Sequence, residues 1–352
     1  MKISEKYARI NLACNYDLSG RFFLLLLEKY ECAENILKDI PKISNAGIIK
    51  EKESKNDIKK INLDDVVVYG EIGYPNYLTQ IPDPPIALFT KGNFHGINFE
   101  KAIAVVGTRK MSTYGIEVTS KLINFLVTKG FIIVSGLAYG IDALAHELTL
   151  TYGGQTIAVL GTSINEPYPQ SNRGLYKRII ENHGLIISED YFKQEYVKWM
   201  FPKRNRIIAG LCKKTIVIEA PKKSGALITA NYAFDFNREV FAVPGPINSI
   251  NCIGTHELIK NNKAQILTGF DDILDQEQLF FGNGLNNTFN SSINALSEDK
   301  KIIFDLIYNG ANSFELLVQK CNYNVEVLFE IIGFLELHDY IKKLEDGSFM
   351  IK

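Results

Sequence analysis

Cations and small residues stand at several points where a short apolar run gives way to a polar segment. Glycine lets backbone N–H groups come close to an anion, and a helix that begins nearby adds the positive end of its dipole. For a single glycine a tight turn is the better explanation, but for a set of them at one edge of a sheet the anion is favoured. The set comprises Gly107, Thr108, Arg109 and Lys110, then Ser135 and Gly136, and finally Lys222, Ser224 and Gly225.

The first of these segments departs from the common nucleotide-binding motifs. The fingerprint G-x-G-x-x-G is absent after Gly107, because Arg109 occupies the position of the second glycine, where its side chain would fill the space meant for a pyrophosphate. The P-loop pattern G-x-x-x-x-G-K-[ST] is absent as well. An arginine at a strand end offers a planar fork suited to phosphate oxygens. The sequence therefore predicts a cationic contact with phosphate in place of a glycine cradle.

A second cationic segment surrounds Pro202, a residue that suits the first turn of a helix. Cations in that turn face the positive end of the helix dipole, and each costs very roughly 0.3–1 kcal/mol when exposed. Locally unfavourable choices cluster at functional sites, so we expect an anion site there. The aromatic residues Trp199 and Phe201 either stack on an unpaired base or pack in the core. The candidate residues are Lys198, Phe201, Lys203, Arg204, Asn205 and Arg206.

Composition narrows the possible functions. The chain has 352 residues and a formal net charge of −1, so any binding of nucleic acid must come from a local basic patch. Five scattered cysteines without a C-x-x-C pair, and histidines without H-E-x-x-H, predict neither a metal nor a cofactor. No apolar run is long enough to span a bilayer and no signal segment opens the chain. We therefore expect a cytoplasmic protein that does not bind membranes.

Short apolar runs alternate with helix-length patterns over residues 61–275. This alternation predicts an α/β fold with a Rossmann-like, mostly parallel sheet and helices on both faces, and ligands of such sheets bind beyond the carboxyl ends of the strands. Residues 1–60 are expected to form a small helical domain of the SAM or helix-hairpin-helix type, and residues 276–297, rich in Asn, Ser and Gly, a linker. Residues 298–352 show three helical patterns and a hairpin, which predicts a winged-helix-like domain.

A series of motifs follows in order between residues 66 and 270. They are Gly107-Thr-Arg with Tyr114-Gly, Ser135-Gly-Leu-Ala-Tyr-Gly-Ile-Asp-Ala-Leu-Ala-His, Tyr168-Pro-Gln-Ser-Asn, Phe201-Pro-Lys-Arg-Asn-Arg-Ile-Ile-Ala-Gly, Glu219-Ala, Ser224-Gly-Ala-Leu-Ile-Thr-Ala and Val240-Phe-Ala-Val-Pro-Gly. This succession resembles the DprA/Smf DNA-processing family. The resemblance is specific because many separate motifs fall in the family's order.

The resemblance implies binding of single-stranded DNA during natural transformation, protection of that DNA, and loading of the RecA recombinase onto it. It also implies a homodimer formed through the α/β domain, and a protein without catalytic activity. The phosphate-contacting arginine of the family falls on Arg109, and the family's basic segment on Arg204 and Arg206. At two positions the family commonly has a basic residue and this chain has Tyr139 and Gln170. Phosphate binding is then weaker than in the family or uses other residues, or Tyr139 stacks on a base instead.

Two other functions remain open at this stage. A nucleotide phosphoribohydrolase of the LOG type would use an acidic residue near the same strand ends, but the segment that begins at Glu219 lacks the glycine string of those enzymes. A sequence-specific regulator would act through the winged helix. Its candidate recognition helix, 325–339, carries acids and neither Lys nor Arg, whereas reading a groove requires cations or amides. We therefore interpret this domain as protein-binding or structural, with Lys342 and Lys343 as its only possible DNA contacts.

Overall fold

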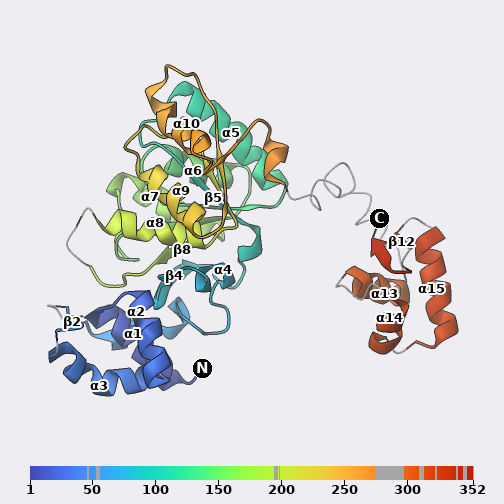
Figure 1. The fold of residues 1–352 in the computed structure, drawn as a ribbon, viewed down its shortest axis with the longest axis horizontal. Helices are drawn as coiled ribbons and strands as arrows, with labels where there is room; N and C mark the ends of the chain where they lie inside the picture. Colours follow the sequence, from blue (N-terminus) through green and yellow to red (C-terminus); the bar gives the residue numbers. More distant parts are fainter. Residues whose placement is uncertain are drawn as a thin grey trace. The chain divides into compact units, whose positions relative to one another are not determined.

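The computed structural model describes residues 1–45, 47–52, 56–193, 197, 199–274, 297–308, 313–321, 323–337, 340–343 and 347–351. The chain divides into two compact units, Met1–Ile273 and Leu274–Lys352, and each is described by itself (Figure 1). The expected linker, 276–297, lies outside the described residues apart from its last position.

The first unit is built on a nine-stranded sheet with the order β11-β10-β9-β5-β6-β7-β8-β4-β3. All pairs from β11 to β8 are parallel, and β4 is antiparallel to both of its neighbours. The predicted fold class is confirmed. The strands are β3 Val66–Val68, β4 Ala87–Gly92, β5 Ala102–Val106, β6 Ile132–Ser135, β7 Thr156–Leu160, β8 Leu185–Ser188, β9 Lys214–Val217, β10 Glu239–Ala242 and β11 Gln265–Ile266.

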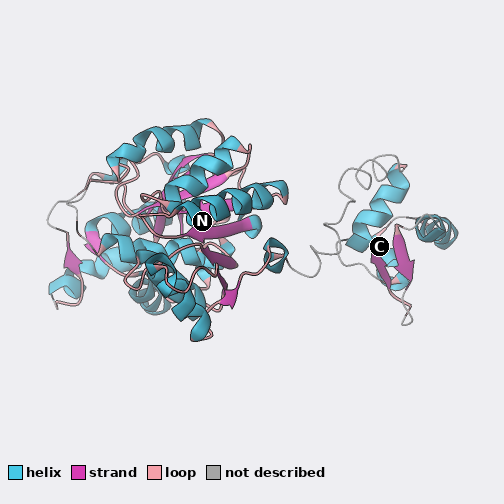
Figure 2. Ribbon diagram, turned by 90° about the horizontal axis from the view of Figure 1, so that it is seen from above, coloured by secondary structure: helices cyan, strands magenta, loops and turns pink. Residues whose placement is uncertain are grey.

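Helices cover both faces of this sheet, as Figure 2 shows from above. Successive residues of a strand point to opposite faces. Along β5, Ala104 packs in one core cluster with residues of α8 and α9, while Ile103 and Val105 pack in another with residues of α5 and α6. The helices are α4 Asn76–Thr79, α5 Thr113–Thr128, α6 Ile141–Thr151, α7 Arg173–Glu181, α8 Met200–Gly210, α9 Gly225–Asp235 and α10 Ile253–Lys260. Single 3₁₀ turns occupy Ile58–Lys60, Leu63–Asp65, Phe99–Lys101, Gln170–Asn172, Ile250–Cys252 and Phe270–Ile273.

The N-terminal helices belong to the same unit as the sheet. They are α1 Ile3–Asn15, α2 Gly20–Tyr30 and α3 Ala33–Asn45, with a two-stranded ribbon of β1 Tyr16–Asp17 and β2 Lys50–Glu51. Ile10 and Cys14 of α1 are buried in one cluster with Phe89 of β4. A side chain at Gly20 would bring its Cβ to 1.7 Å from the carbonyl oxygen of Pro84, so the start of α2 lies directly on the loop before β4.

The second unit has a core of its own. It contains α13 Glu298–Tyr308, α14 Phe314–Lys320, α15 Val325–Leu337, β12 Ile341–Lys343 and β13 Phe349–Ile351, the last two paired antiparallel. Ile303, Leu317, Leu328 and Ile341 are buried together. This order of elements is typical of a winged helix, and assignment to that class stays a prediction. In the described part of either unit, no helix has both the length and the apolar character needed to cross a bilayer.

Candidate nucleic-acid interface

The strand order brings several loops together at the carboxyl edge of the sheet. β5 lies between β9 and β6, and β7 follows β6. Because parallel strands end at the same edge, the segments that follow them are neighbours. The backbone N–H of Thr108 donates to the carbonyl of Glu219 at 2.7 Å, and that of Ile141 donates to the carbonyl of Thr108 at 3.2 Å. The loops after β9, β5 and β6 therefore form one connected surface.

Arg109 and Lys110 are exposed on a loop whose backbone is held from several sides. Thr108, which is buried, accepts a hydrogen bond from the backbone N–H of Lys110 at 3.2 Å through its Oγ1. The carbonyl of Lys110 accepts one from Nδ2 of Asn251 at 3.0 Å. Neither cationic side chain makes a hydrogen bond or ion pair with the part of the chain that the structure describes. The loop thus presents two available cations to solvent on a fixed backbone.

The glycines at this edge serve close packing of the protein itself. A Cβ at Gly140, where φ is +77°, would lie 2.3 Å from the carbonyl oxygen of Thr108. A Cβ at Gly107 would meet the side chain of Ile141 at 2.6 Å, and one at Gly136 would meet the guanidinium of Arg204 at 2.7 Å. Tight packing between loops accounts for both glycines, and the backbone N–H of Gly136 already donates to Asp142 at 3.1 Å. An anion contact at Gly107 and Gly136 stays a prediction.

Arg204 is the fifth residue of α8 and is only 6% exposed. Its Nη1 donates to the carbonyl oxygens of Gly136, at 2.7 Å, and Val159. Its Nε donates to Oδ1 of the neighbouring Asn205 at 3.1 Å, and Nδ2 of Asn205 donates to the carbonyl of Gly225 at 3.2 Å. This buried pair ties the loop after β6, the end of β7 and the start of α9 into one frame.

The charge of Arg204 is balanced inside the protein. Burial lowers the pKa of the guanidinium to about 10, the carboxylate of Asp142 raises it, and the nearby cation Arg109 lowers it further. Asp142 accepts a hydrogen bond from the backbone N–H of Gly136 at 3.1 Å. Burial raises the pKa of Asp142, and Arg204 opposes that rise. Because Arg109 affects the pKa of Arg204, this exposed side chain lies close to Arg204 and Asp142.

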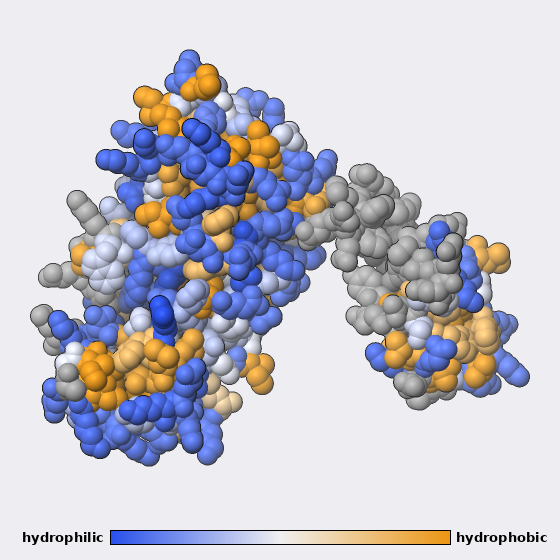
Figure 3. All heavy atoms as spheres, in the orientation of Figure 1, coloured by the Kyte–Doolittle hydropathy of each residue, from blue (hydrophilic) through white to orange (hydrophobic). Residues whose placement is uncertain are grey.

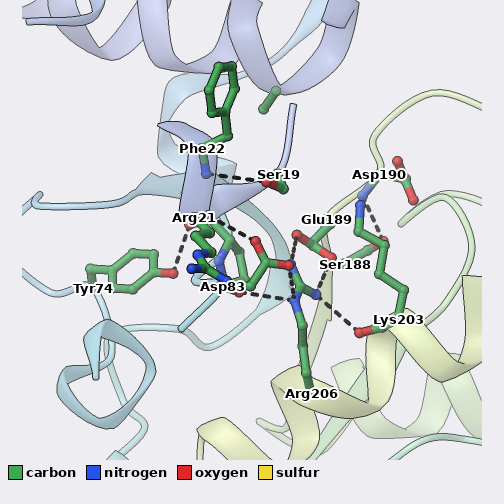
Figure 4. Close-up of polar contacts among 12 residues, drawn as sticks. Ser19, Arg21, Phe22, Tyr74, Asp83, Ser188, Glu189, Asp190, Lys203 and Arg206 are labelled. Atoms are coloured by element: carbon green, nitrogen blue, oxygen red, sulfur yellow. Dashed lines mark hydrogen bonds and ion pairs between the residues drawn. The ribbon is translucent and has the colours of Figure 1, made fainter. Parts of the chain in front are cut away.

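Arg206, two residues further along α8, forms a second buried network (Figure 4). Its guanidinium, 4% exposed, donates to both carboxylate oxygens of Glu189 at 2.7 and 2.6 Å and to Asp83 at 3.0 Å. Asp83 also accepts a hydrogen bond from the backbone N–H of Arg21 in α2 at 3.0 Å. Burial alone would raise the pKa of Glu189, but Arg206, with help from Lys203, lowers it to about 2. The network links α8 to the end of β8 and to the N-terminal helices.

These contacts correct three of the sequence-based assignments. Arg204 and Arg206 do not face solvent, and we assign them to positioning the edge and not to binding phosphate. Ser135 is fully buried and donates its hydroxyl hydrogen to the carbonyl of Val105 at 2.7 Å. The expected placement of these arginines in the first turn of the helix is also wrong. α8 begins at Met200, two residues before Pro202, so Arg204 and Arg206 are its fifth and seventh residues and lie beyond the turn where the dipole penalty of about 0.3–1 kcal/mol applies.

Other predicted residues do reach the surface. Lys203 and Gly225 are exposed, and Ser224 caps α9 by accepting a hydrogen bond from the backbone N–H of Ala226 at 3.2 Å. Lys222 is exposed with its Nζ 3.7 Å from Glu257, a surface contact that a ligand can displace. Lys198 lies outside the described residues.

Aromatic side chains lie beside these cations. Trp199 is 56% exposed, and Nζ of Lys203 lies 6.0 Å from its ring centre. Phe201 is half-buried, with its ring 5.4 Å from that of Tyr168. Tyr139 is 47% exposed in the loop after β6. Of the two possibilities for Trp199 and Phe201, exposure supports a ligand-facing role for Trp199, whereas Phe201 packs partly within the protein.

Some residues that shape the site carry no signal in the sequence. Asn251 holds the carbonyl of Lys110 from far along the chain, and Glu189 and Asp83 balance Arg206 from two different loops. Each is an ordinary surface residue type, and only the fold brings it to its partner. Across the described ranges, no three His, Cys, Asp or Glu side chains are grouped as a metal would require.

Comparison with known proteins identifies the family. Residues 65–278 match the family model described as DNA recombination-mediator protein A. The chain belongs to this DprA family. It is 44% identical over 201 residues to the DNA processing protein DprA of Streptococcus pneumoniae, covering 57% of this chain and 70% of that protein. It is 43% identical over 216 residues to the protein Smf of Synechocystis, covering 58% of this chain.

Solved structures of DprA proteins have the same fold. The Streptococcus pneumoniae structure is 32% identical with a TM-score of 0.63, and the match covers 78% of this chain and 99% of that one. The Helicobacter pylori structure, described by its single-stranded DNA binding mode, is 29% identical with a TM-score of 0.53, and the match covers 59% and 93%. Among the curated relatives, the alignment spans only about half of the Synechocystis protein, 54% of its length.

The pair of Glu189 and Arg206 predicts a specific dependence of stability on pH. Because the pKa of Glu189 is depressed to about 2 in the folded protein, its contribution is present above the unfolded value and is lost as pH falls toward 2. That contribution is on the order of 3 kcal/mol. We expect Glu189→Gln to lower the free energy of unfolding in urea at neutral pH and to flatten its fall below about pH 4.3.

Glu117→Gln is the matched control for this prediction. Glu117 pairs with Lys121 at 2.7 Å on the exposed side of α5, where both side chains are more than half exposed. Exposed pairs contribute little to stability, so the free energy of unfolding in urea should not change. Equal effects of the two substitutions would contradict the importance assigned to the buried pair.

Proposed function

We propose that the first unit is a single-stranded-DNA-binding, DNA-processing module that holds the phosphate backbone at the carboxyl edge of its sheet. The observation that carries the proposal is the loop of Arg109 and Lys110: two exposed side chains without protein partners among the described residues, on a backbone fixed by Thr108 and Asn251. Such cations bind phosphate by charge, whatever the base sequence. The Helicobacter pylori relative, described as binding single-stranded DNA, supports the same ligand.

The surrounding residues favour an unpaired strand. Lys203 and Lys222 extend the cationic surface, and the start of α9 at Ser224 and Gly225 offers backbone N–H groups and a helix dipole to a further phosphate. Trp199 and Tyr139 are exposed beside the cations, and stacking of a base on such a ring contributes about 1–3 kcal/mol. A base inside a duplex cannot stack in this way. We therefore expect slight sequence preference and weaker binding of duplex DNA.

The finer function follows the family resemblance. In this proposal, the protein protects incoming single-stranded DNA in the cytoplasm during natural transformation and loads the RecA recombinase onto it. It acts as a homodimer through the α/β unit, without a cofactor and without catalytic activity. Arg204, Asn205 and Arg206 contribute by holding the loops in place, since their side chains are buried.

The alternative, a nucleotide phosphoribohydrolase, is disfavoured by the position of Glu219. Its side chain is fully buried, and its carboxylate accepts hydrogen bonds from the backbone N–H of Ser112 at 3.0 Å and from the hydroxyl of Ser112 at 2.5 Å. A carboxylate occupied in this way fixes the start of α5 and is not available to a reactant. We expect no release of base from nucleoside monophosphates by the purified protein, assayed by chromatography. Hydrolysis that Glu219→Gln abolishes would support the enzyme instead.

Arg109 and Arg204 are close together, but their substitution should affect different properties: DNA affinity for Arg109 and stability for Arg204. Arg109→Ala removes one phosphate contact, so affinity for oligo-dT should fall and the slope of log affinity against log salt should decrease by about 0.7, with an unchanged melting temperature. Arg204→Ala leaves Asp142 buried without its partner, and such losses cost about 3–5 kcal/mol, so the melting temperature should drop. Fluorescence anisotropy and thermal unfolding measure the two effects.

The two variants distinguish a residue that binds phosphate, Arg109, from one that positions the loops, Arg204. Arg109→Lys keeps the charge and serves as the control, with a salt slope close to that of the unchanged protein. Unchanged oligo-dT affinity and salt slope in a stable Arg109→Ala protein would overturn the assignment of this edge.

Trp199 provides a direct optical test because it is the only tryptophan of the chain. With 56% of the residue exposed, its emission should be that of a hydrated indole and should be quenched when oligo-dT stacks on the ring. An abasic oligonucleotide of the same length keeps the phosphates and removes the bases, so it should bind with much less quenching. Equal quenching by both would show that no base reaches Trp199.

A further inference from the structure

Helix α15 of the second unit has one side in the core and one side open. Leu328 and Leu335 are buried in the core cluster of the unit. On the opposite side, Phe329 is 59% and Leu337 81% exposed, with Gly333 midway between them. Residues four apart lie on one face of a helix. Among the described residues, these three lie along one face that is open apart from the ring of Phe314, which stacks on Phe329. Figure 3 shows hydrophobic atoms among hydrophilic ones on the visible side of this unit.

Gly333 has no local reason to be glycine. A Cβ placed there would meet no atom within 4 Å, and its φ is not in the left-handed region. Glycine in an exposed helix interior is less favourable than alanine by about 1 kcal/mol. What glycine does allow is close approach of another backbone. A flat position between two exposed apolar side chains therefore fits a helix that crosses α15 at this point.

Phe329 is already held in position. Its ring stacks on that of Phe314 from α14, with centroids 4.4 Å apart and planes at 29°. An aromatic ring fixed before binding loses little conformational entropy when a partner covers it. The face is therefore prepared to anchor a partner.

The charges around this face define the partner. Glu326, Glu330 and Glu336 are exposed on α15, and the helix contains neither Lys nor Arg. Residues 298–352 as a whole carry ten acidic residues against six lysines. Duplex DNA would be repelled, and a second copy of the same face would bring like charges together. The complementary surface is apolar and basic.

We infer that the α15 face, defined by Phe329, Gly333 and Leu337 with its flanking glutamates, binds a basic amphipathic helix of another protein. The apolar side of that helix covers Phe329 and Leu337 and crosses at Gly333, while its Lys and Arg side chains meet Glu326, Glu330 and Glu336. This is helix-in-groove recognition in which the apolar anchors Phe329 and Leu337 are about two helical turns apart. The inference concerns the second unit and stands independently of DNA binding by the first.

The test uses the full chain and a fluorescent synthetic helix with leucines on one side and lysines on the other. Gly333→Ala should raise the stability of α15 but weaken peptide binding about tenfold, and Phe329→Ser should weaken it by at least as much. Leu316→Ser is the control. Leu316 is exposed on α14 two residues after Phe314, so it points to the opposite side of that helix from the ring that stacks on Phe329, and its loss should leave binding unchanged. A peptide with glutamate in place of lysine should not bind.

Three outcomes would overturn the inference. The first is peptide binding that Gly333→Ala and Phe329→Ser leave unchanged, which would indicate charge attraction alone. The second is self-association in sedimentation experiments that Leu337→Ser abolishes, which would make a second copy the occupant. The third is duplex DNA binding lost in the same variants.

Discussion

The burial of two arginines in α8 is the interaction on which the proposed DNA-binding edge depends. A buried guanidinium is tolerated only where carboxylates and carbonyls satisfy it. Arg204 meets this requirement with Asp142 and the carbonyls of two strand ends, and Arg206 with Glu189 and Asp83. Each arginine thereby fixes loops that lie far apart in the sequence. The exposed cations next to them owe their positions to this internal frame.

The buried and the exposed cations therefore have different roles. A positively charged side chain that is saturated inside the protein holds structure, and one on the rim without a partner is available for phosphate. Arg109 lies near enough to Arg204 to lower its pKa, so the two kinds of cation are adjacent. Because Asp142 balances the charge of Arg204, and Glu189 and Asp83 balance that of Arg206, the positive charge left for a phosphate backbone is that of the exposed cations.

Much of the fold could be predicted from the sequence. Alternating apolar and helical patterns are strong signals. They predict helices over 141–151 and 226–237; α6 has the first range unchanged, and α9 begins one residue and ends two residues before the second. The antiparallel strands β3 and β4 were not predicted, because direction in a sheet depends on connections more than on composition. The pattern before Pro41 predicts a helix that ends near this proline, whereas in the structure Pro41 lies inside α3. The errors at the site have a similar cause, because sequence alone does not show which distant residues the fold brings together. The basic residues after Pro202 look exposed in the sequence, but the fold brings Glu189 and Asp83 to Arg206.

Photo-cross-linking of the protein to oligo-dT with halogenated bases, followed by mass spectrometry, tests the central claim most directly. Bases held at the proposed edge lie next to exposed aromatic side chains, and aromatic residues trap such bases efficiently. The account predicts cross-links at Trp199 and Tyr139, and their loss in Arg109→Ala. Cross-links confined to α10, to the N-terminal helices or to the second unit would contradict it.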